Sequence, residues 1–277
     1  MIYRMVFLRL LPFLLFLLSC SSQPFDQDGG DLKRSEVERI SERLRTLTEQ
    51  EFPLLKHKLI TRYIDKLGQS IVSHDREMPP LPYEFRVLKS NEALVFSLPG
   101  GIVYVSLGLI RMVEFEGQLA SAIAHELAHQ RLGHQLVAWR RKVNGSRGQG
   151  YLLEFRGEWK TSFLGERGAL FLDRGMEEEA DKLAPVILYK AGFDPRLYSS
   201  YLQLLQREEE AHTEMVAALL SLHPPLAERL LWAKESWLRI PPKKDPAVSS
   251  PTFQQIKAIL KEVQKMSPKA GKKKERK

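Results

Sequence analysis

The sequence predicts an α+β fold that is predominantly helical and carries one small β-sheet. Most of the chain repeats apolar residues at helical spacing, whereas only residues 78–106 alternate or are rich in β-branched and aromatic residues. The chain has 277 residues and is 43% hydrophobic, which is sufficient for one sizeable core with appendages. We therefore expect a single folded domain over residues 31–240.

The N-terminal residues are typical of a bacterial export signal. Arg4 and Arg9 accompany an apolar run that ends in Leu-Leu-Ser-Cys at residues 17–20. That run is too short to cross a bilayer, and the order of positive residues, apolar core and small residue is typical of a signal peptide over residues 1–20. Its end resembles a lipobox, which implies lipid attachment at Cys20, the only cysteine. A chance cysteine after a plain signal peptide is the alternative.

The elements of the domain follow a polar, glycine-containing tether at residues 21–30. Strands are predicted at 78–88 and 102–106, where prolines or glycines precede alternating or β-branched residues. The remaining apolar periodicity is helical. It predicts helices at 37–47, 54–72, 107–114, 116–141, 176–190, 195–220 and 225–238.

The net charge of +8 is concentrated near the two ends of the sequence. Residues 265–277 carry +6 and the two N-terminal arginines supply the other +2, so the intervening residues are balanced. The sequence shows no nucleic-acid-binding signature, and we expect no nucleic-acid partner. The basic residues 265–277 are expected to be a solvated appendage, with at most weak contact to anionic lipid or envelope polymer. The whole Pro- and Lys-rich segment 241–277 is expected to be a frayed C-terminal tail, with one amphipathic helix over residues 253–266 as the alternative.

The segment His-Glu-Leu-Ala-His at residues 125–129 is the strongest chemical signal. Four helical residues turn by about 400°, so His125 and His129 project from nearly the same face and one ion can touch both rings. Zinc accepts imidazole nitrogen, and the glutamate beside the first ligand can reach a water at the metal. Glu126 is therefore the predicted general base. The alternative is a solvated His-Glu-His face, which the surrounding apolar residues disfavour.

A hydrolytic zinc site needs a third protein ligand. The candidates are His134, His212, His223 and the acidic run Glu-Glu-Glu-Ala-Asp at 177–181. On a continuous helix His134 would point about 140° away from His129, which disfavours it. The acidic run lies on a separate predicted helix and is better placed to complete the site.

Four motifs in one order resemble metallopeptidase family forty-eight. Residues 125–129 and 177–181 are similar to the gluzincin pair H-E-x-x-H and E-x-x-A-D. Residues 91–110 resemble the family's N-A-F-x-L-P-G-G strand, and residues 223–229 resemble its H-P-x-x-x-x-R element. The family includes CAAX prenyl proteases, heat-shock membrane proteases and periplasmic lipoprotein proteases. The resemblance favours the last branch, because no multi-pass transmembrane segments surround the motif as they do in the two membrane-embedded branches.

This resemblance implies a gluzincin-type domain that binds one Zn²⁺ per chain through His125, His129 and Glu177. Glu178 is the alternative third ligand. Asp181 would hydrogen-bond a ligand imidazole and fix its tautomer. In such a domain, the edge strand of a small β-sheet borders the active site.

Two further residues are implied to lie near the metal. His223 and Arg229 would stabilise the oxyanion of the substrate. A histidine at this position in some relatives instead occupies the fourth zinc position and restrains activity. Both residues also have a structural alternative, as a helix boundary and as a salt-bridge partner.

The resemblance also implies a substrate site. An extended peptide would pair with an exposed strand edge beside the metal, which the two glycines allow it to approach closely. An interior strand with no exposed edge is the alternative. The implied substrate-binding residues are Gly100, Gly101, Ile102, Val103 and Tyr104.

Together these features predict a zinc-dependent endopeptidase of the bacterial cell envelope, anchored by lipid on the periplasmic side, with the outer membrane as the expected destination. Its expected substrates are unfolded or misassembled envelope proteins, and Glu126 would move a water proton to the leaving amine. The alternative is a chaperone-like or assembly factor that binds extended polypeptides with little or regulated proteolysis.

Acid is expected to weaken such a site, because protons compete with zinc for the imidazole nitrogens of His125 and His129. We expect activity to fall below about pH 6, near the reference pKa of imidazole. A pH–activity profile measures this. Full activity well below that pH would contradict histidine ligation.

Overall fold

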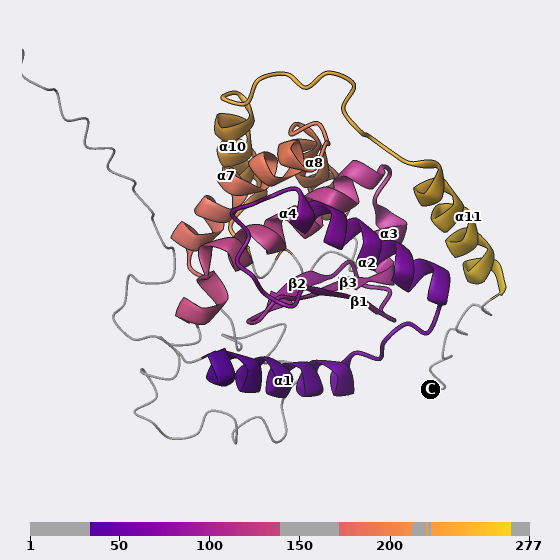
Figure 1. The fold of residues 1–277 in the computed structure, drawn as a ribbon. Coiled ribbons are helices and arrows are strands. Elements are labelled where there is room, and N and C mark those ends of the chain that lie inside the picture. Colours follow the sequence, from indigo (N-terminus) through magenta and orange to yellow (C-terminus); the bar gives the residue numbers. More distant parts are fainter. Residues whose placement is uncertain (1–33, 139–171, 212–219, 221–222, 267–277) are drawn as a thin grey trace, which may run out of the picture.

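The computed structural model describes residues 34–138, 172–211, 220 and 223–266 (Figure 1). The predicted signal peptide, Cys20 and the tether lie outside these ranges, as do His212 and residues 267–277. The helices are α1 (Arg34–Glu51), α2 (Lys58–Ser73), α3 (Leu107–Met112), α4 (Glu116–Leu132), α7 (Arg174–Lys190), α8 (Leu197–Glu210), α10 (Leu226–Trp237) and α11 (Pro251–Met266). The strands are β1 (Glu84–Leu88), β2 (Val95–Leu98) and β3 (Ile102–Ser106). The predominantly helical α+β class with one small sheet is confirmed.

The three strands form one sheet in the order β1-β3-β2. β3 pairs in parallel with β1 and antiparallel with β2, so its main chain is hydrogen-bonded on both sides. The interpretation of residues 102–106 as a sheet edge is therefore wrong. Ile102, Val103 and Tyr104 are buried in a central strand and have no free main-chain edge to offer a peptide. The edge strand next to α4 is β2.

Strand alternation sends the side chains of the sheet into two cores. Val103 and Val105 join the larger core with α2 and α4, whereas Ile102 and Tyr104 pack with Leu44 of α1. Figure 1 shows α1 along one face of the sheet and α4 across the other. The active-site motif thus lies on the face opposite α1.

Helix α4 is buried at every position from 116 to 130, which agrees with its run of small apolar residues. It ends at Leu132 because Gly133 takes a left-handed conformation, with φ 72°, and its amide bonds back to the carbonyl oxygens of Gln130 and His129. The expectation of a helix continuing to residue 141 is wrong. Residues 134–138 form a separate helical segment beyond the glycine.

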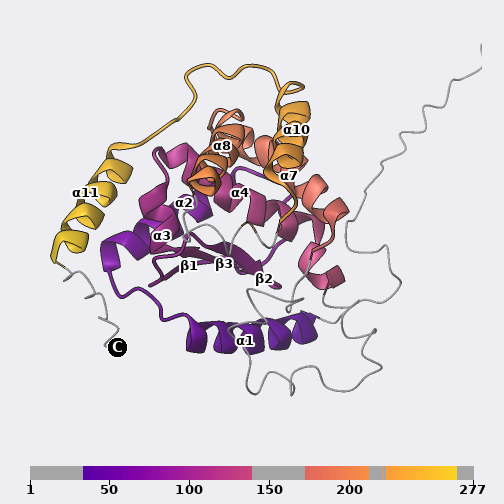
Figure 2. The ribbon, with the colours of Figure 1, turned by 180° about the vertical axis from the view of Figure 1, so that it is seen from behind.

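Helices α7 and α8 pack against α4 on the side away from the sheet, and α10 packs on α7 and α8, as the view from behind shows (Figure 2). Within the C-terminal tail, the helical alternative holds and the frayed segment does not extend over it. Residues 251–266 form α11, which buries Phe253, Ile256 and Leu260 in the larger core. Within the described residues, no helix has both the length and the apolar composition needed to cross a bilayer.

Candidate metal centre

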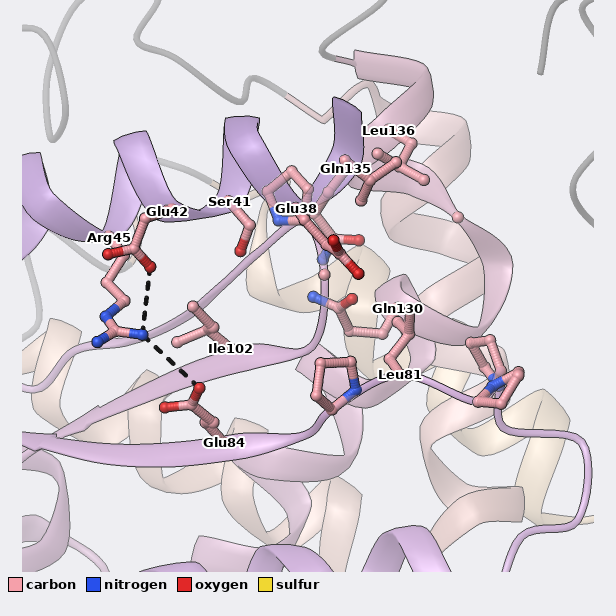
Figure 3. A pocket seen from close by; sticks show the side chains of 17 residues that line it. Glu38, Ser41, Glu42, Arg45, Leu81, Glu84, Ile102, Gln130, Gln135 and Leu136 are labelled. Atoms are coloured by element: carbon pink, nitrogen blue, oxygen red, sulfur yellow. Dashed lines mark ion pairs between the residues drawn. The ribbon is translucent and has the colours of Figure 1, made fainter. Parts of the chain in front are cut away.

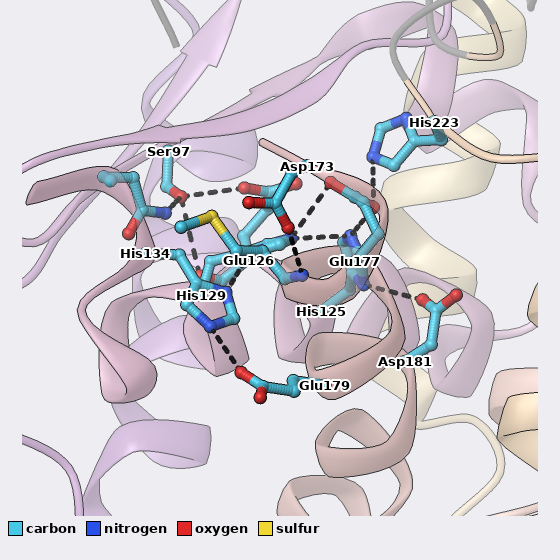
Figure 4. A network of polar contacts seen from close by, with 12 residues as sticks. Ser97, His125, Glu126, His129, His134, Asp173, Glu177, Glu179, Asp181 and His223 are labelled. Atoms are coloured by element: carbon cyan, nitrogen blue, oxygen red, sulfur yellow. Dashed lines mark hydrogen bonds and ion pairs between the residues drawn. The ribbon is translucent and has the colours of Figure 1, made fainter. Parts of the chain in front are cut away.

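Helices α4 and α7 bring two histidines and one glutamate together in the interior (Figure 4). The N-cap Asp173 starts α7 by accepting a hydrogen bond from the amide of Met176. Glu177 therefore lies in the first turn of α7. Its carboxylate faces His125 and His129 of α4, and each of these three residues is at most 2% exposed.

The three facing groups have the spacing of metal ligands. The Nε2 atoms of His125 and His129 are 3.1 Å apart. Glu177 Oε2 is 3.5 Å from His125 Nε2, and Glu177 Oε1 is 3.5 Å from His129 Nε2. Tetrahedral zinc with bonds of about 2.0–2.2 Å separates its ligand atoms by about 3.4 Å. The donor set and its dimensions fit a zinc ion.

An unpartnered oxygen supports the same conclusion. Glu177 Oε2 is buried and makes no hydrogen bond to any residue that the structure describes. Buried carboxylate oxygens normally have partners, and a cation is one that this donor set would accept. Glu178, the alternative ligand, instead pairs with Lys182 at 2.7 Å and is not part of the cluster.

The His125 imidazole is held from behind by a buried polar network. Its Nδ1 lies 3.0 Å from Asp181 Oδ1 and 3.0 Å from the Tyr198 hydroxyl, which itself donates to Asp181. This contact leaves Nε2 directed toward Glu177 and His129. Asp181 is therefore where the motif comparison expects it, on the side of the ring away from the candidate metal position. The sequence does not predict the contact of Tyr198 with this network, because an aromatic residue at helical spacing is typical of a hydrophobic core.

Arg229 lies beside the His125 ring, with its Nη2 atom 3.4 Å from Nδ1, and is bound by the Asp181 carboxylate. Its Nε and Nη2 atoms donate to the two oxygens of Asp181, each at 2.8 Å, and Nη2 also donates to the Tyr198 hydroxyl at 3.1 Å. The residue is only 2% exposed. These contacts favour the structural alternative, in which Arg229 is the buried counter-ion of Asp181, over the expected oxyanion role.

His223, which precedes α10, does reach the candidate metal position. Its Nε2 lies 3.7 Å from Glu177 Oε2, and a ligand atom from each of His125, Glu126 and His223 falls within 4.8 Å of the others. Figure 4 shows its ring beside Glu177. His223 can therefore donate to a substrate bound there or contribute a further ligand.

The edge strand β2 contacts the predicted general base. Ser97 Oγ donates to Glu126 Oε2 at 2.8 Å and accepts from Gln135 Nε2 at 2.6 Å. Ser97 was not singled out from the sequence, although alternation with Val95 places it on the face of the sheet that meets α4. The predicted edge strand bordering the site exists, but it is β2 and not β3.

Burial dominates the electrostatics of this centre. It raises the pKa of Glu126 to about 7, so the carboxylate is suited to exchange a proton near neutrality. Burial and the Arg229 charge lower the pKa of His125, but its contacts with the Asp181 and Glu177 carboxylates outweigh them and raise it to about 9. Burial also acts to raise the pKa of Glu177, yet the nearby His223 and His129 hold it well below its ordinary value.

The two predicted substrate-binding glycines form the turn between β2 and β3. Gly100 and Gly101 have φ values of 89° and 98°, which residues other than glycine rarely adopt. Gly100 also lines a cavity of about 450 Å³ that lies between α1 and this turn (Figure 3). Gln135 lines the same cavity, so its side chain connects the cavity wall to Ser97.

A mainly helical domain with H-E-x-x-H on one helix and the facing glutamate on another defines a gluzincin-type metallopeptidase fold. Residues 58–236 match the model of Peptidase family M48, and the chain belongs to this family.

Three curated relatives illustrate the similarity. The chain is 28% identical over 195 residues to the beta-barrel assembly-enhancing protease of Escherichia coli (strain K12), an alignment that covers 66% of this chain and 40% of the relative. It is 25% identical over 214 residues to the protein of the same name from Yersinia pestis, covering 73% and 43%. It is 31% identical over 189 residues to the mitochondrial metalloendopeptidase OMA1 of Schizosaccharomyces pombe, covering 64% and 53%. The chain thus spans about half the length of these relatives or less.

Proposed function

We propose that the protein is a zinc-dependent endopeptidase of the bacterial cell envelope that cleaves extended or misfolded proteins. The observation that carries the proposal is the buried set of His125, His129 and Glu177, whose ligand atoms lie 3.1–3.5 Å apart beside the carboxylate of Glu126. The names of the relatives, a beta-barrel assembly-enhancing protease and a metalloendopeptidase, support peptide hydrolysis. The predicted lipobox at Cys20 supports an envelope location.

In this proposal each residue of the centre has one task. His125, His129 and Glu177 hold the zinc ion, which when bound polarises the scissile carbonyl and lowers the pKa of a bound water. Glu126 accepts a proton from the attacking water and delivers it to the leaving amine. Ser97 restrains Glu126 by donating to one of its oxygens, which leaves the other oxygen for the proton.

The substrate strand in this proposal is β2. In the part of the chain that the structure describes, β2 pairs only with β3, and we assign its outer edge to an extended peptide. Main-chain pairing at this edge would provide affinity with little selection of side chains. Such binding suits unfolded segments, because a folded substrate seldom exposes an extended main chain.

His223 has two tasks that its position supports. With Nε2 only 3.7 Å from Glu177 Oε2, it can donate to the oxyanion of the substrate or occupy a further coordination position and restrain the enzyme. Replacement of His223 by alanine separates them. Activity falls if the residue stabilises the oxyanion, and it rises if the residue restrains the site.

Metal analysis with proteolysis tests the proposed function. We expect about one zinc per purified wild-type chain, cleavage of an unfolded polypeptide such as casein, and loss of cleavage on chelation with recovery on adding zinc. Glu177→Ala is expected to lose both zinc and cleavage, because only two protein ligands remain. Glu178→Gln is the matched control and should retain both. Absence of metal from the wild type, or full zinc content in Glu177→Ala, would refute the proposal.

A further inference from the structure

The two candidate ligand imidazoles are oriented alike, but different partners hold them. Each directs Nε2 toward the other and toward Glu177, and each directs Nδ1 away. Asp181 meets the Nδ1 of His125. The Nδ1 of His129 instead lies 2.9 Å from Nδ1 of His134, a residue for which the proposed function supplies no task.

His134 has a second contact that completes a chain of hydrogen bonds. Its Nε2 lies 3.0 Å from Glu179 Oε2 (Figure 4). His134 is 4% exposed, whereas the side chain of Glu179 is 66% exposed and remains hydrated at its outer end. The chain therefore runs from the buried His129 through His134 to a carboxylate in contact with solvent.

The placement of hydrogens along this chain has one consistent solution for a neutral His134. An ionised carboxylate can only accept, so His134 carries its proton on Nε2 and has a lone pair on Nδ1. That lone pair can accept only if His129 carries its own proton on Nδ1. His129 Nε2 is then unprotonated and free to bind a cation.

The turn of the polypeptide backbone that makes the contact between His129 and His134 possible follows directly from Gly133. A continuous helix would direct His134 about 140° away from His129. Because Gly133 takes a left-handed conformation, α4 ends at Leu132, before His134. The backbone then turns His134 back onto the His129 ring, and the two ring centroids are 5.1 Å apart. The next residue, Gln135, bonds to Ser97 on the other side.

We propose that His134 and Glu179 are positioning residues for the metal centre: they fix His129 in the Nδ1–H tautomer and aim its Nε2 at the ion. This inference rests on the proposed zinc-dependent function. It extends that function by giving the second histidine ligand the same kind of support that Asp181 gives to the first.

The tautomer of His129 can be measured without catalysis. In full-length protein freed of metal by a chelator and labelled with ¹⁵N-histidine, NMR should find His129 protonated at Nδ1. His134→Leu should lose this preference, because its side chain cannot accept the hydrogen bond. His134→Asn should keep it, because the asparagine Oδ1 can accept in place of Nδ1. An unchanged tautomer in His134→Leu would overturn the inference.

Zinc affinity provides the second measurement, by competition with a chromogenic chelator. We expect His134→Leu to weaken zinc binding by about 10–100-fold, with smaller losses for His134→Asn and Glu179→Gln. Glu178→Gln is the matched control, one residue away and paired with Lys182 instead, and should bind within about twofold of wild type. If His134→Leu does not fold, His134→Asn and Glu179→Gln still decide the question.

The outcomes separate this inference from the function on which it depends. A wild-type chain that binds no zinc would refute the proposed function itself. A wild-type chain that binds zinc, with His134→Leu and Glu179→Gln binding it equally well, would refute only the positioning role.

Discussion

Replacement of Glu126 by glutamine is expected to abolish peptide cleavage while zinc remains bound. Glutamine has nearly the same shape and its amide oxygen can still accept the hydrogen bond from Ser97, but it cannot take up a proton. General-base catalysis typically contributes 10²–10⁴-fold, and we expect a loss of kcat of roughly that size or more. The measurement is hydrolysis of an unfolded polypeptide together with zinc content.

The same substitution at the exposed Glu92 serves as a control and should leave both quantities unchanged. Retained cleavage in Glu126→Gln would refute the mechanism. Because this variant should still bind peptides, it also separates the two functions that the sequence allows. If Glu126→Gln restores the envelope phenotype of a strain lacking the protein, the chaperone-like alternative is favoured over the peptidase.

Removal of the Arg229 guanidinium is expected to cause a large loss of stability. In Arg229→Met, Asp181 would remain in the interior, where it is fully buried, without the two hydrogen bonds and the positive charge that now compensate it. Breaking one partner of a buried ion pair typically costs about 3–5 kcal/mol in the free energy of unfolding. Urea denaturation of the metal-free protein measures this loss, because zinc binding would otherwise add to the apparent stability.

A double variant tests whether the loss arises from the orphaned carboxylate. Asp181→Leu with Arg229→Met removes both charges, and we expect it to be more stable than Arg229→Met alone. A different result would restore the role expected from the motif comparison. If Arg229→Met folds with wild-type stability but loses kcat, the guanidinium acts on the substrate and not on Asp181.

The sequence by itself determined the local part of the metal centre. His125 and His129 lie four residues apart on a helix, so their common face follows from helical geometry alone. The apolar residues around them correctly predicted a buried helix. Glu177 is 48 residues beyond His129, and periodicity placed it only on another helix. The motif comparison singled it out, and the contact between α4 and α7 puts it beside the imidazoles.

The order of the strands could not be deduced from composition. β3 has the β-branched and aromatic content of a strand, but composition does not tell a central strand from an edge. Only pairing on both sides shows that β3 is central and that β2, with Ser97, is the edge beside Glu126. The role of Arg229 was equally open, because a lone arginine can face a substrate or a buried aspartate.

The position of His134 depends both on a signal in the sequence and on the tertiary structure. Gly133 is a helix-terminating signal that the sequence contains, and it explains why the His134 ring turns back to His129 instead of pointing about 140° away, although His134 is not among the candidate ligands. The sequence determined that the helix could end there and that the two motif histidines share one face. Only the tertiary structure decided which groups meet their Nδ1 atoms. Asp181 comes from α7, whose position depends on how the helices pack, and His134 is turned back onto His129 by the backbone conformation of Gly133, which helical spacing does not give.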